Sequence, residues 1–208
     1  MSKKVAIIDY GMGNLFSVKL ACEQVGLDSL ITNNKAEILT ADALILPGVG
    51  AFADAMNDLS KMDLVNTIKE FINSGKPFLG ICLGMQLLMT ESEEFGKHKG
   101  LDIIKGKVLK FDNKKEKVPQ VGWNKIIKNK DWENSLAENL SDGEYMYFVH
   151  SFYCQPEDEE IILSETDYAG ETYCSSLKKD NIFACQFHPE KSGEKGLLIY
   201  KNLANLIK

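Results

Sequence analysis

Long apolar runs are missing from this sequence. Near its start, residues 5–8 form a short apolar run that Asp9 ends. A secretory signal needs an apolar stretch of roughly 7–15 residues, and a membrane span needs roughly 20. The sequence therefore predicts neither a signal peptide nor a membrane segment, and we expect a cytoplasmic protein.

Paired cysteines are missing as well. The chain has five cysteines, an odd number, and none stands in a CxxC pair or at zinc-ligand spacing. This argues against a disulfide framework and a metal site, and four of the five are expected to be small buried side chains. The glycine-containing segment 47–50 lacks the Lys-Ser/Thr of a P-loop. We expect no metal and no cofactor.

Basic clusters are also scarce. The formal net charge is −6, from 24 Lys and Arg against 30 Asp and Glu. Nucleic acids and anionic membranes are therefore not expected as partners. Hydrophobic residues make up 44% and charged residues 26% of the 208 positions, which suits one domain with a sizeable core. We find no repeat, low-complexity tract or linker, so we expect a single domain over residues 1–208.

The first half of the chain alternates between short apolar runs and segments with helical periodicity. The apolar runs, which predict buried strands, are 5–8, 43–46 and 78–81. Helices are expected at 15–25, from about 53, at 64–72 and at 83–89, with Asn14 capping the first. Such alternation is typical of a parallel sheet with helices on both faces.

The second half is rich in strand-like segments. We expect strands at 108–111, 125–128, 145–152, 161–165, 172–177 and 182–187, and a closing helix at about 196–207. These strands should extend the sheet through hairpins and antiparallel pairing. The predicted fold class is α/β, a three-layer arrangement with a mixed central sheet between flanking helices.

Cys82 lies between a predicted strand and a predicted helix, in the pattern G-x-C-x-G. This pattern corresponds to a nucleophile elbow with cysteine in place of serine. The turn would hold the sulfur at a helix N-terminus, where the helix dipole and free N–H groups favour a thiolate. A buried structural cysteine beside two packing glycines would give the same pattern, so the pattern alone does not separate the two.

A thiolate nucleophile needs a general base, and the chain has only three histidines. His98 stands between two lysines and is expected in solvent. His150 follows a predicted strand, as either a buried polar residue or a neighbour of the site. His188 ends a strand, and Glu190 follows two residues later, where its carboxylate can hold one imidazole tautomer. We therefore prefer His188 as the base and Glu190 as the group that orients it.

Acyl transfer also needs N–H donors for an oxyanion. The segment Pro47-Gly48-Val49-Gly50 follows a neighbouring strand, and its glycines allow the backbone to turn the Val49 N–H toward the active site. The N–H of Leu83, directly after the predicted nucleophile, is the second expected donor. Taken alone, a Pro-Gly-x-Gly run is more often a plain turn.

Six segments of the chain together resemble the class I (triad) glutamine amidotransferases, and more narrowly the glutaminase subunits of imidazole glycerol phosphate synthases. The segments span nearly the whole sequence. They are 9–14 (DYGMGN), 47–52 (PGVGAF), 80–88 (GICLGMQLL), 121–124 (VGWN), 147–151 (YFVHS) and 186–192 (QFHPEKS). Any one of them could occur by chance, but six in family order are specific.

The resemblance implies that Cys82 is the nucleophile, His188 the acid and base, and Glu190 the orienting carboxylate. It also implies that Gln86 and Glu94 help to hold the substrate glutamine, although Glu94 stands among acidic residues that are typical of a plain surface. The family's partner is a synthase subunit of (β/α)8 barrel fold. The resemblance therefore implies a heterodimer that transfers ammonia within histidine biosynthesis.

The partner is expected to dock at the mouth of the site, over Trp123, Asn124, Ser151 and Lys191. Each has a plainer explanation, as a core tryptophan, a turn asparagine, a strand-end serine and a solvated lysine. Lys191 directly follows the triad glutamate, however, so it cannot lie far from the mouth. An aromatic side chain at such a mouth can anchor an interface.

Gln120 departs from the family pattern, where we expect histidine, and leaves the identity of the partner open. The main alternative is a related glutaminase subunit that supplies ammonia for amidination of a surface sugar. Further alternatives are a stand-alone cysteine peptidase and a non-catalytic interaction subunit. The complete triad argues against the latter, because a dead site would not need it.

Overall fold

The computed structural model describes residues 3–207. Parallel strands form one half of its sheet, in the order β2 (Asp28–Thr32), β1 (Lys4–Ile8), β3 (Ala43–Leu46), β4 (Phe78–Ile81) and β13 (Ile182–Cys185). Successive side chains of β1 alternate between two hydrophobic cores, with Val5 and Ile7 in one and Ala6 and Ile8 in the other. Because both faces are buried, these strands are apolar throughout, and short apolar runs mark them in the sequence.

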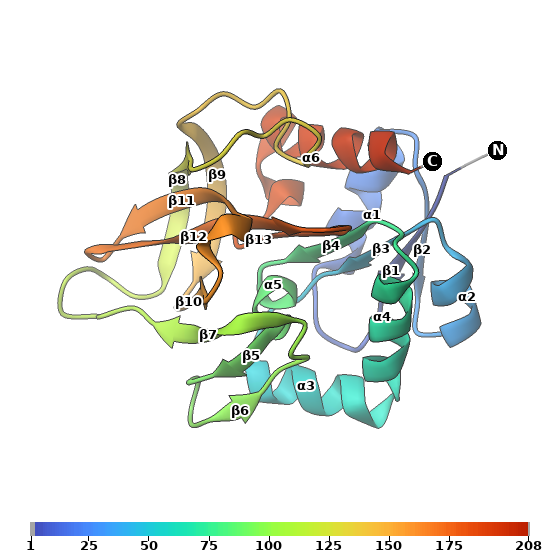
Figure 1. The fold of residues 1–208 in the computed structure, drawn as a ribbon, viewed down its shortest axis with the longest axis horizontal. Coiled ribbons are helices and arrows are strands. Elements are labelled where there is room, and N and C mark those ends of the chain that lie inside the picture. Colours follow the sequence, from blue (N-terminus) through green and yellow to red (C-terminus); the bar gives the residue numbers. More distant parts are fainter. Residues whose placement is uncertain (1–2, 208) are drawn as a thin grey trace.

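Antiparallel strands continue the sheet beyond β13 (Figure 1). Outward from β13 they are β12 (Glu171–Lys179), β10 (Phe152–Pro156), β7 (Ile104–Lys110), β5 (Met89–Ser92) and β6 (His98–Lys99), and among them β5 runs parallel to β7. A branch leaves β12 through β11 (Ile162–Tyr168) and β8 (Gln120–Lys128) to β9 (Glu144–His150). The sheet is therefore mixed, as the sequence predicts.

Helices cover both faces of the parallel half (Figure 1). On one face lie α1 (Leu15–Gln24) and α6 (Gly193–Leu206), and on the other lie α2 (Lys35–Thr40), α3 (Phe52–Lys61) and α4 (Leu64–Asn73). The short helix α5 (Leu83–Leu87) follows β4 directly, and η1 (Glu159–Ile161) and η2 (Pro189–Lys191) are single 3-10 turns. This arrangement confirms the expected three-layer α/β fold.

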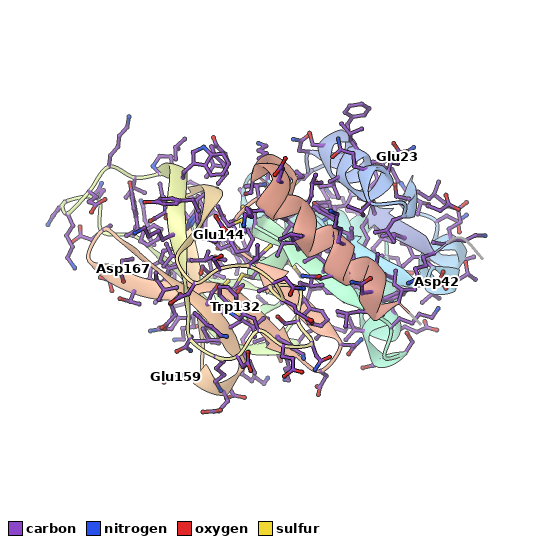
Figure 2. All side chains as sticks on the ribbon, turned by 90° about the horizontal axis from the view of Figure 1, so that it is seen from above. Glu23, Asp42, Trp132, Glu144, Glu159 and Asp167 are labelled. Carbon is purple, nitrogen blue, oxygen red and sulfur yellow. The ribbon has the colours of Figure 1, made fainter. Side chains whose placement is uncertain are left out.

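The two halves of the sheet extend in opposite directions. Seen from above in Figure 2, Glu23 and Asp42 lie at the end formed by the parallel strands, and Glu159 and Asp167 lie at the other end. No helix within residues 3–207 is long and apolar enough to cross a membrane.

Some elements differ from the sequence expectation. The sequence does not predict β2, α2, β5 or β6, and the strand expected at 145–152 is two strands, β9 and β10, separated at Ser151. Asn14 occupies the N-cap position of α1 as expected, but its side chain makes no capping hydrogen bond. Asn34 caps α2 instead, where its side-chain oxygen accepts from the N–H groups of Ala36 and Glu37.

One edge of the sheet gathers the residues that the sequence singles out. Parallel strands place their carboxyl ends together. Residues 47–50 follow β3, Cys82 follows β4, and His188 lies a short way past β13. The strand order β3-β4-β13 therefore brings together three segments that are far apart along the chain.

Candidate active site

Cys82 lies on the turn between β4 and α5. Its backbone has φ 53° and ψ −109°, a conformation that residues with a side chain rarely adopt. Such backbone strain costs of order 1–3 kcal/mol and is found where a side chain must be aimed. The sulfur accepts from Gln186 Nε2 at 3.5 Å and is 4.0 Å from the Val149 carbonyl oxygen. The G-x-C-x-G pattern predicts a sharp turn of this kind.

Two glycines make this turn possible. A Cβ on Gly84 would lie 1.8 Å from the Leu46 carbonyl oxygen, and a Cβ on Gly80 would lie 3.0 Å from the Gly84 oxygen. Position 84 therefore has no room for a side chain, and position 80 has little. The glycine after the cysteine lets α5 begin directly against the end of β3.

His188 and Glu190 form a buried pair just past β13. His188 Nδ1 lies 2.8 Å from Glu190 Oε1, and only 2% and 1% of the two side chains is exposed. A carboxylate only accepts, so Nδ1 carries the hydrogen. Nε2 has no hydrogen-bond partner among the described residues. The imidazole is thus held in one tautomer with Nε2 available for proton transfer.

Electrostatic interactions couple His188 to Cys82. Burial lowers the pKa of His188, but the negative charge on Cys82 and the Glu190 carboxylate outweigh burial and raise this pKa to about 10. The imidazole is therefore protonated at neutral pH when the sulfur is a thiolate. Such an ion pair combines a nucleophile with an acid that can protonate a leaving group.

A cavity of about 320 Å³ opens at Cys82. This volume suits a small-molecule ligand. The residues that line the cavity are Val49, Gly50, Cys82, Leu83, Gln86, Glu94, Pro119, Val149, His150, Ser151 and Phe152.

Three of the four residues expected at the oxyanion hole, Val49, Gly50 and Leu83, line this cavity. Gly48 lies behind them, where a Cβ would be 2.4 Å from the Tyr10 hydroxyl and 2.9 Å from the Leu83 Cβ. The segment therefore packs directly on the turn that carries the cysteine, and a side chain at position 48 would push the two apart.

Gln86 and Glu94, which the resemblance assigns to glutamine binding, also line the cavity. Gln86 Nε2 donates to the Phe152 carbonyl at 2.9 Å and to Gln186 Oε1 at 3.0 Å. The Glu94 carboxylate accepts from the Phe52 N–H at 2.5 Å. Both side chains are thus fixed by protein partners at the cavity.

The sequence assigns no role to Pro119, Val149 or Phe152, which complete the wall of the cavity. They lie around β8 and the β9–β10 connection, and of the three only Val149 falls in a segment that resembles the family, 147–151. His150, which the sequence leaves open, is both a buried polar residue, 6% exposed, and part of this wall. Burial, opposed by its hydrogen bond to the backbone, lowers the pKa of His150 to about 4, so its ring is neutral near pH 7.

The four residues expected to contact a partner differ in their surroundings. The Trp123 side chain is 56% exposed and meets the Tyr147 ring edge-on at 6.1 Å, and Lys191 Nζ lies 5.8 Å from the centre of the same ring. Asn124 is only partly exposed, and its Nδ2 donates to a backbone carbonyl of β11 at 3.0 Å. Ser151 lines the cavity. Trp123, Lys191 and the half-buried Tyr147 thus form one group at the surface, which we call the aromatic surface.

The geometry defines a class of protein. A cysteine on a strained turn, a histidine in one tautomer and a carboxylate behind it are the parts of an enzyme that transfers acyl groups through a cysteine nucleophile. Comparison with known families narrows this class, because the model of the class I glutamine amidotransferases matches residues 6–204. The chain belongs to the class I glutamine amidotransferase family.

Individual relatives cover nearly the full length. The chain is 50% identical to the imidazole glycerol phosphate synthase subunit HisH of Caldanaerobacter subterraneus, over 98% of each chain. It is 47% identical to the protein of the same name from Chlorobaculum tepidum, over 96% of this chain and 98% of the relative. The Aquifex aeolicus protein of that name is 48% identical, over 96% and 95%.

Solved structures share the fold at much lower identity. PurLQS from Thermotoga maritima superimposes with a TM-score of 0.79 at 20% identity and full coverage of both chains. A glutamine amidotransferase from the same organism gives 0.60 at 18% identity, over 91% of this chain and 77% of that one. These likenesses concern the fold alone.

Proposed function

We propose that this chain is the glutaminase subunit of an imidazole glycerol phosphate synthase and forms one amidotransferase domain over residues 1–208. The observation that carries the proposal is the position of Cys82, on a strained turn beside a histidine that a carboxylate orients. Relatives that bear this subunit's name at 47% and 50% identity support the histidine pathway.

The first half of the reaction forms a thioester. The Cys82 thiolate attacks the side-chain amide carbon of glutamine, and the N–H groups of Val49 and Leu83 bind the oxyanion that results. His188 gives its Nε2 proton to the amide nitrogen, the C–N bond breaks, and ammonia leaves. Glu190 stabilises the imidazolium until that transfer and keeps the ring in position.

The second half regenerates the cysteine. Neutral His188 takes a proton from water, and the hydroxide attacks the thioester carbon. The C–S bond breaks, which restores the thiolate–imidazolium pair and releases the carboxylic acid, and this acid gives up its proton to solvent and becomes glutamate. Gln86 and Glu94, fixed at the cavity by their protein partners, hold glutamine during both halves.

The ammonia that this reaction releases has to be used by a second protein. Ammonia that reaches bulk water is protonated and no longer nucleophilic, so the product must pass directly to the enzyme that uses it. The proposed partner is a (β/α)8 barrel, the synthase subunit, bound to this chain as a heterodimer. There ammonia converts a ribulosyl-formimino intermediate of histidine biosynthesis into imidazole glycerol phosphate and an aminoimidazole carboxamide nucleotide.

The test compares two nitrogen sources in the complex of this chain with the synthase subunit from the same genome. The wild-type complex should make imidazole glycerol phosphate from glutamine or from ammonium salts. Cys82→Ala should abolish the glutamine-dependent reaction and keep the ammonia-dependent one, because only the former needs the nucleophile. Cys22→Ala, which changes another buried cysteine, is the matched control and should keep both.

Two outcomes would count against the proposal. Glutamine hydrolysis by Cys82→Ala above about 1% of wild type would reject Cys82 as the nucleophile. A wild-type chain that hydrolyses glutamine but never supplies this synthase would reject the histidine pathway, and would favour the sugar-amidinating alternative.

A further inference from the structure

Three buried polar side chains are linked by hydrogen bonds at the cavity wall formed by residues 149–152, where His150 belongs to the wall and Gln120 and Tyr173 are not among the lining residues. His150 Nδ1 is 2.8 Å from the Phe152 carbonyl oxygen, and His150 Nε2 is 3.3 Å from the Tyr173 hydroxyl. The same hydroxyl is 2.9 Å from Gln120 Oε1. Exposure is 6% for His150, 2% for Tyr173 and 3% for Gln120. The proposed reaction assigns no role to any of them.

This group joins separate parts of the sheet to the substrate cavity. Gln120 begins β8, where it pairs with His150 of β9, and Tyr173 lies in β12. The Phe111 ring packs against the rings of both His150 and Tyr173, at 5.3 and 5.2 Å. The Phe152 carbonyl that accepts from His150 also accepts from Gln86 Nε2 at 2.9 Å. One carbonyl therefore fixes both the wall and a side chain of the cavity.

The placement of hydrogens follows from the chemistry of the groups. A carbonyl only accepts, so His150 Nδ1 carries the hydrogen and, in the neutral ring, Nε2 is an acceptor. The nearby donor is the Tyr173 hydroxyl, which has a single proton. For that proton to reach His150, Gln120 must turn its NH2 group toward the tyrosine oxygen. A glutamine amide can rotate by 180° to do so, and the Tyr173 oxygen and His150 Nε2 then each accept a hydrogen bond.

We propose that Gln120, Tyr173 and His150 are positioning residues that fix the Phe152 carbonyl, and through it Gln86 and the wall at 149–152, for glutamine binding. The inference rests on the proposed glutaminase function. These residues act on the wall of the cavity and not on the sulfur or the reacting carbon. Their loss therefore weakens substrate binding and leaves the chemical step nearly intact.

The test distinguishes the effect of the His150 hydrogen bond on glutamine binding from the effect of the size of its side chain. His150→Phe keeps a planar ring but removes the Nδ1–H, whereas His150→Asn places an amide N–H near the position of Nδ1. In the complex with the synthase subunit, His150→Phe should raise KM for glutamine about tenfold with kcat within about threefold of wild type. His150→Asn should restore KM to within about threefold of wild type.

Three results would overturn the proposal. The first is an unchanged KM in His150→Phe, and the second is a large fall in kcat at constant KM, which would place His150 in the chemistry. The third is an equal rise in KM for the Asn and Phe variants, which would indicate bulk alone. If His150→Phe does not fold, Tyr173→Phe takes its place, with an expected rise in KM of about threefold, and an unchanged KM overturns the proposal.

A binding measurement separates this proposal from the proposed function. Calorimetric titration of glutamine into the complex of the Cys82→Ala chain needs no turnover. Adding His150→Phe to the Cys82→Ala chain should raise the Kd for glutamine about tenfold. The same Kd with and without His150→Phe overturns the proposal. A wild-type complex that binds glutamine without hydrolysing it would overturn the proposed function and leave the titration to decide the role of His150.

Discussion

At the scale of single residues, the surroundings shift the pKa values of two histidines of one site in opposite directions. The charge on Cys82 and the Glu190 carboxylate outweigh burial and raise the pKa of His188 to about 10. Burial lowers the pKa of His150 to about 4, against the hydrogen bond to Phe152. A site with one charged and one neutral imidazole has only one histidine able to give a proton at neutral pH.

The first prediction separates the roles of the two histidines. His188→Asn should lower the glutaminase rate by roughly 10³-fold or more, because acid and base are lost together. His150→Asn should lower the rate far less, since its amide still donates to the Phe152 carbonyl. Both rates are measured at saturating glutamine in the complex. If His150→Asn is the slower of two equally folded proteins, His150 is the base.

The second prediction concerns acid stability. The folded-state pKa of His150, about 4, lies below the unfolded value of 6.5, so the folded protein favours the neutral ring. The contribution of neutral His150 to the free energy of unfolding is fully present above pH 6.5 and is lost as the pH falls toward 4. By linkage, His150 contributes a loss of about 2 kcal/mol in the free energy of unfolding between pH 7 and pH 5.

Urea unfolding of wild type and His150→Asn at these two pH values measures the effect. The wild-type protein should lose about 2 kcal/mol more than the variant between pH 7 and pH 5. An equal loss in the free energy of unfolding in the two proteins would show that His150 does not cause the loss of stability in acid.

Residue contacts can be predicted from the sequence where the partners are close along the chain. Glu190 stands two residues after His188, and the expected hydrogen bond between them is present at 2.8 Å. The group of Gln120, Tyr173 and His150 joins positions on three different strands, and each looks alone like an ordinary polar residue of a strand. Such a group depends on strand register, which the sequence of one strand does not define.

At the scale of elements, the segment after β3 is held only in part. Gly48 packs against the Tyr10 hydroxyl and the elbow, whereas Val49 is 40% exposed at the cavity. Gly50 has φ +97°, a conformation that glycine adopts without strain. We therefore expect the glycines to allow the Val49 peptide two orientations, of which one would direct its N–H at the proposed oxyanion.

The third prediction follows from that freedom. The isolated chain should hydrolyse glutamine very slowly, and the synthase subunit with its acceptor should raise kcat by roughly 10²-fold or more by favouring the productive orientation. Steady-state glutaminase assays with and without the partner measure the change. Full turnover by the isolated chain would show that the segment is already in its productive form.

Strands can be predicted from the sequence where both of their faces are buried. β4 has the bounds expected from its apolar run, because both of its faces are buried. β2 exposes Asp28 and Leu30, and β5 is the largely polar MTES, so neither has a continuous apolar run. The split between β9 and β10 is missed because the buried side chains continue on both sides of Ser151.

At the scale of the whole molecule, hydrogen bonds connect the aromatic surface to His188, the proposed base. His188 N–H donates to the Tyr147 carbonyl at 2.8 Å. Ser192 Oγ donates to the His188 carbonyl at 2.7 Å and accepts from the Tyr147 N–H at 3.0 Å. A protein bound over Trp123 and Tyr147 would therefore contact the strand that holds His188, close to the proposed site of ammonia release.

The last prediction is that the synthase subunit docks on this surface. Trp123 is a large exposed aromatic side chain, and such residues anchor interfaces. Trp123→Ala should therefore weaken association about tenfold or more. Lys191, whose ammonium lies over the Tyr147 ring, is placed to pair with a carboxylate of the partner. Lys191→Ala should reduce partner-stimulated glutaminase activity and leave the unfolding of the free chain almost unchanged.

Lys61→Ala is the matched control for the lysine, because Lys61 ends α3 and its side chain is also exposed. Asn124 should matter less than Trp123, since its side chain bonds to β11 and does not belong to the aromatic surface. Titration of each variant with the synthase subunit gives both affinity and stimulation. Unchanged affinity for Trp123→Ala together with unchanged stimulation for Lys191→Ala would place the docking face elsewhere, because removal of an anchor and of a charged contact cannot both be silent at a true interface.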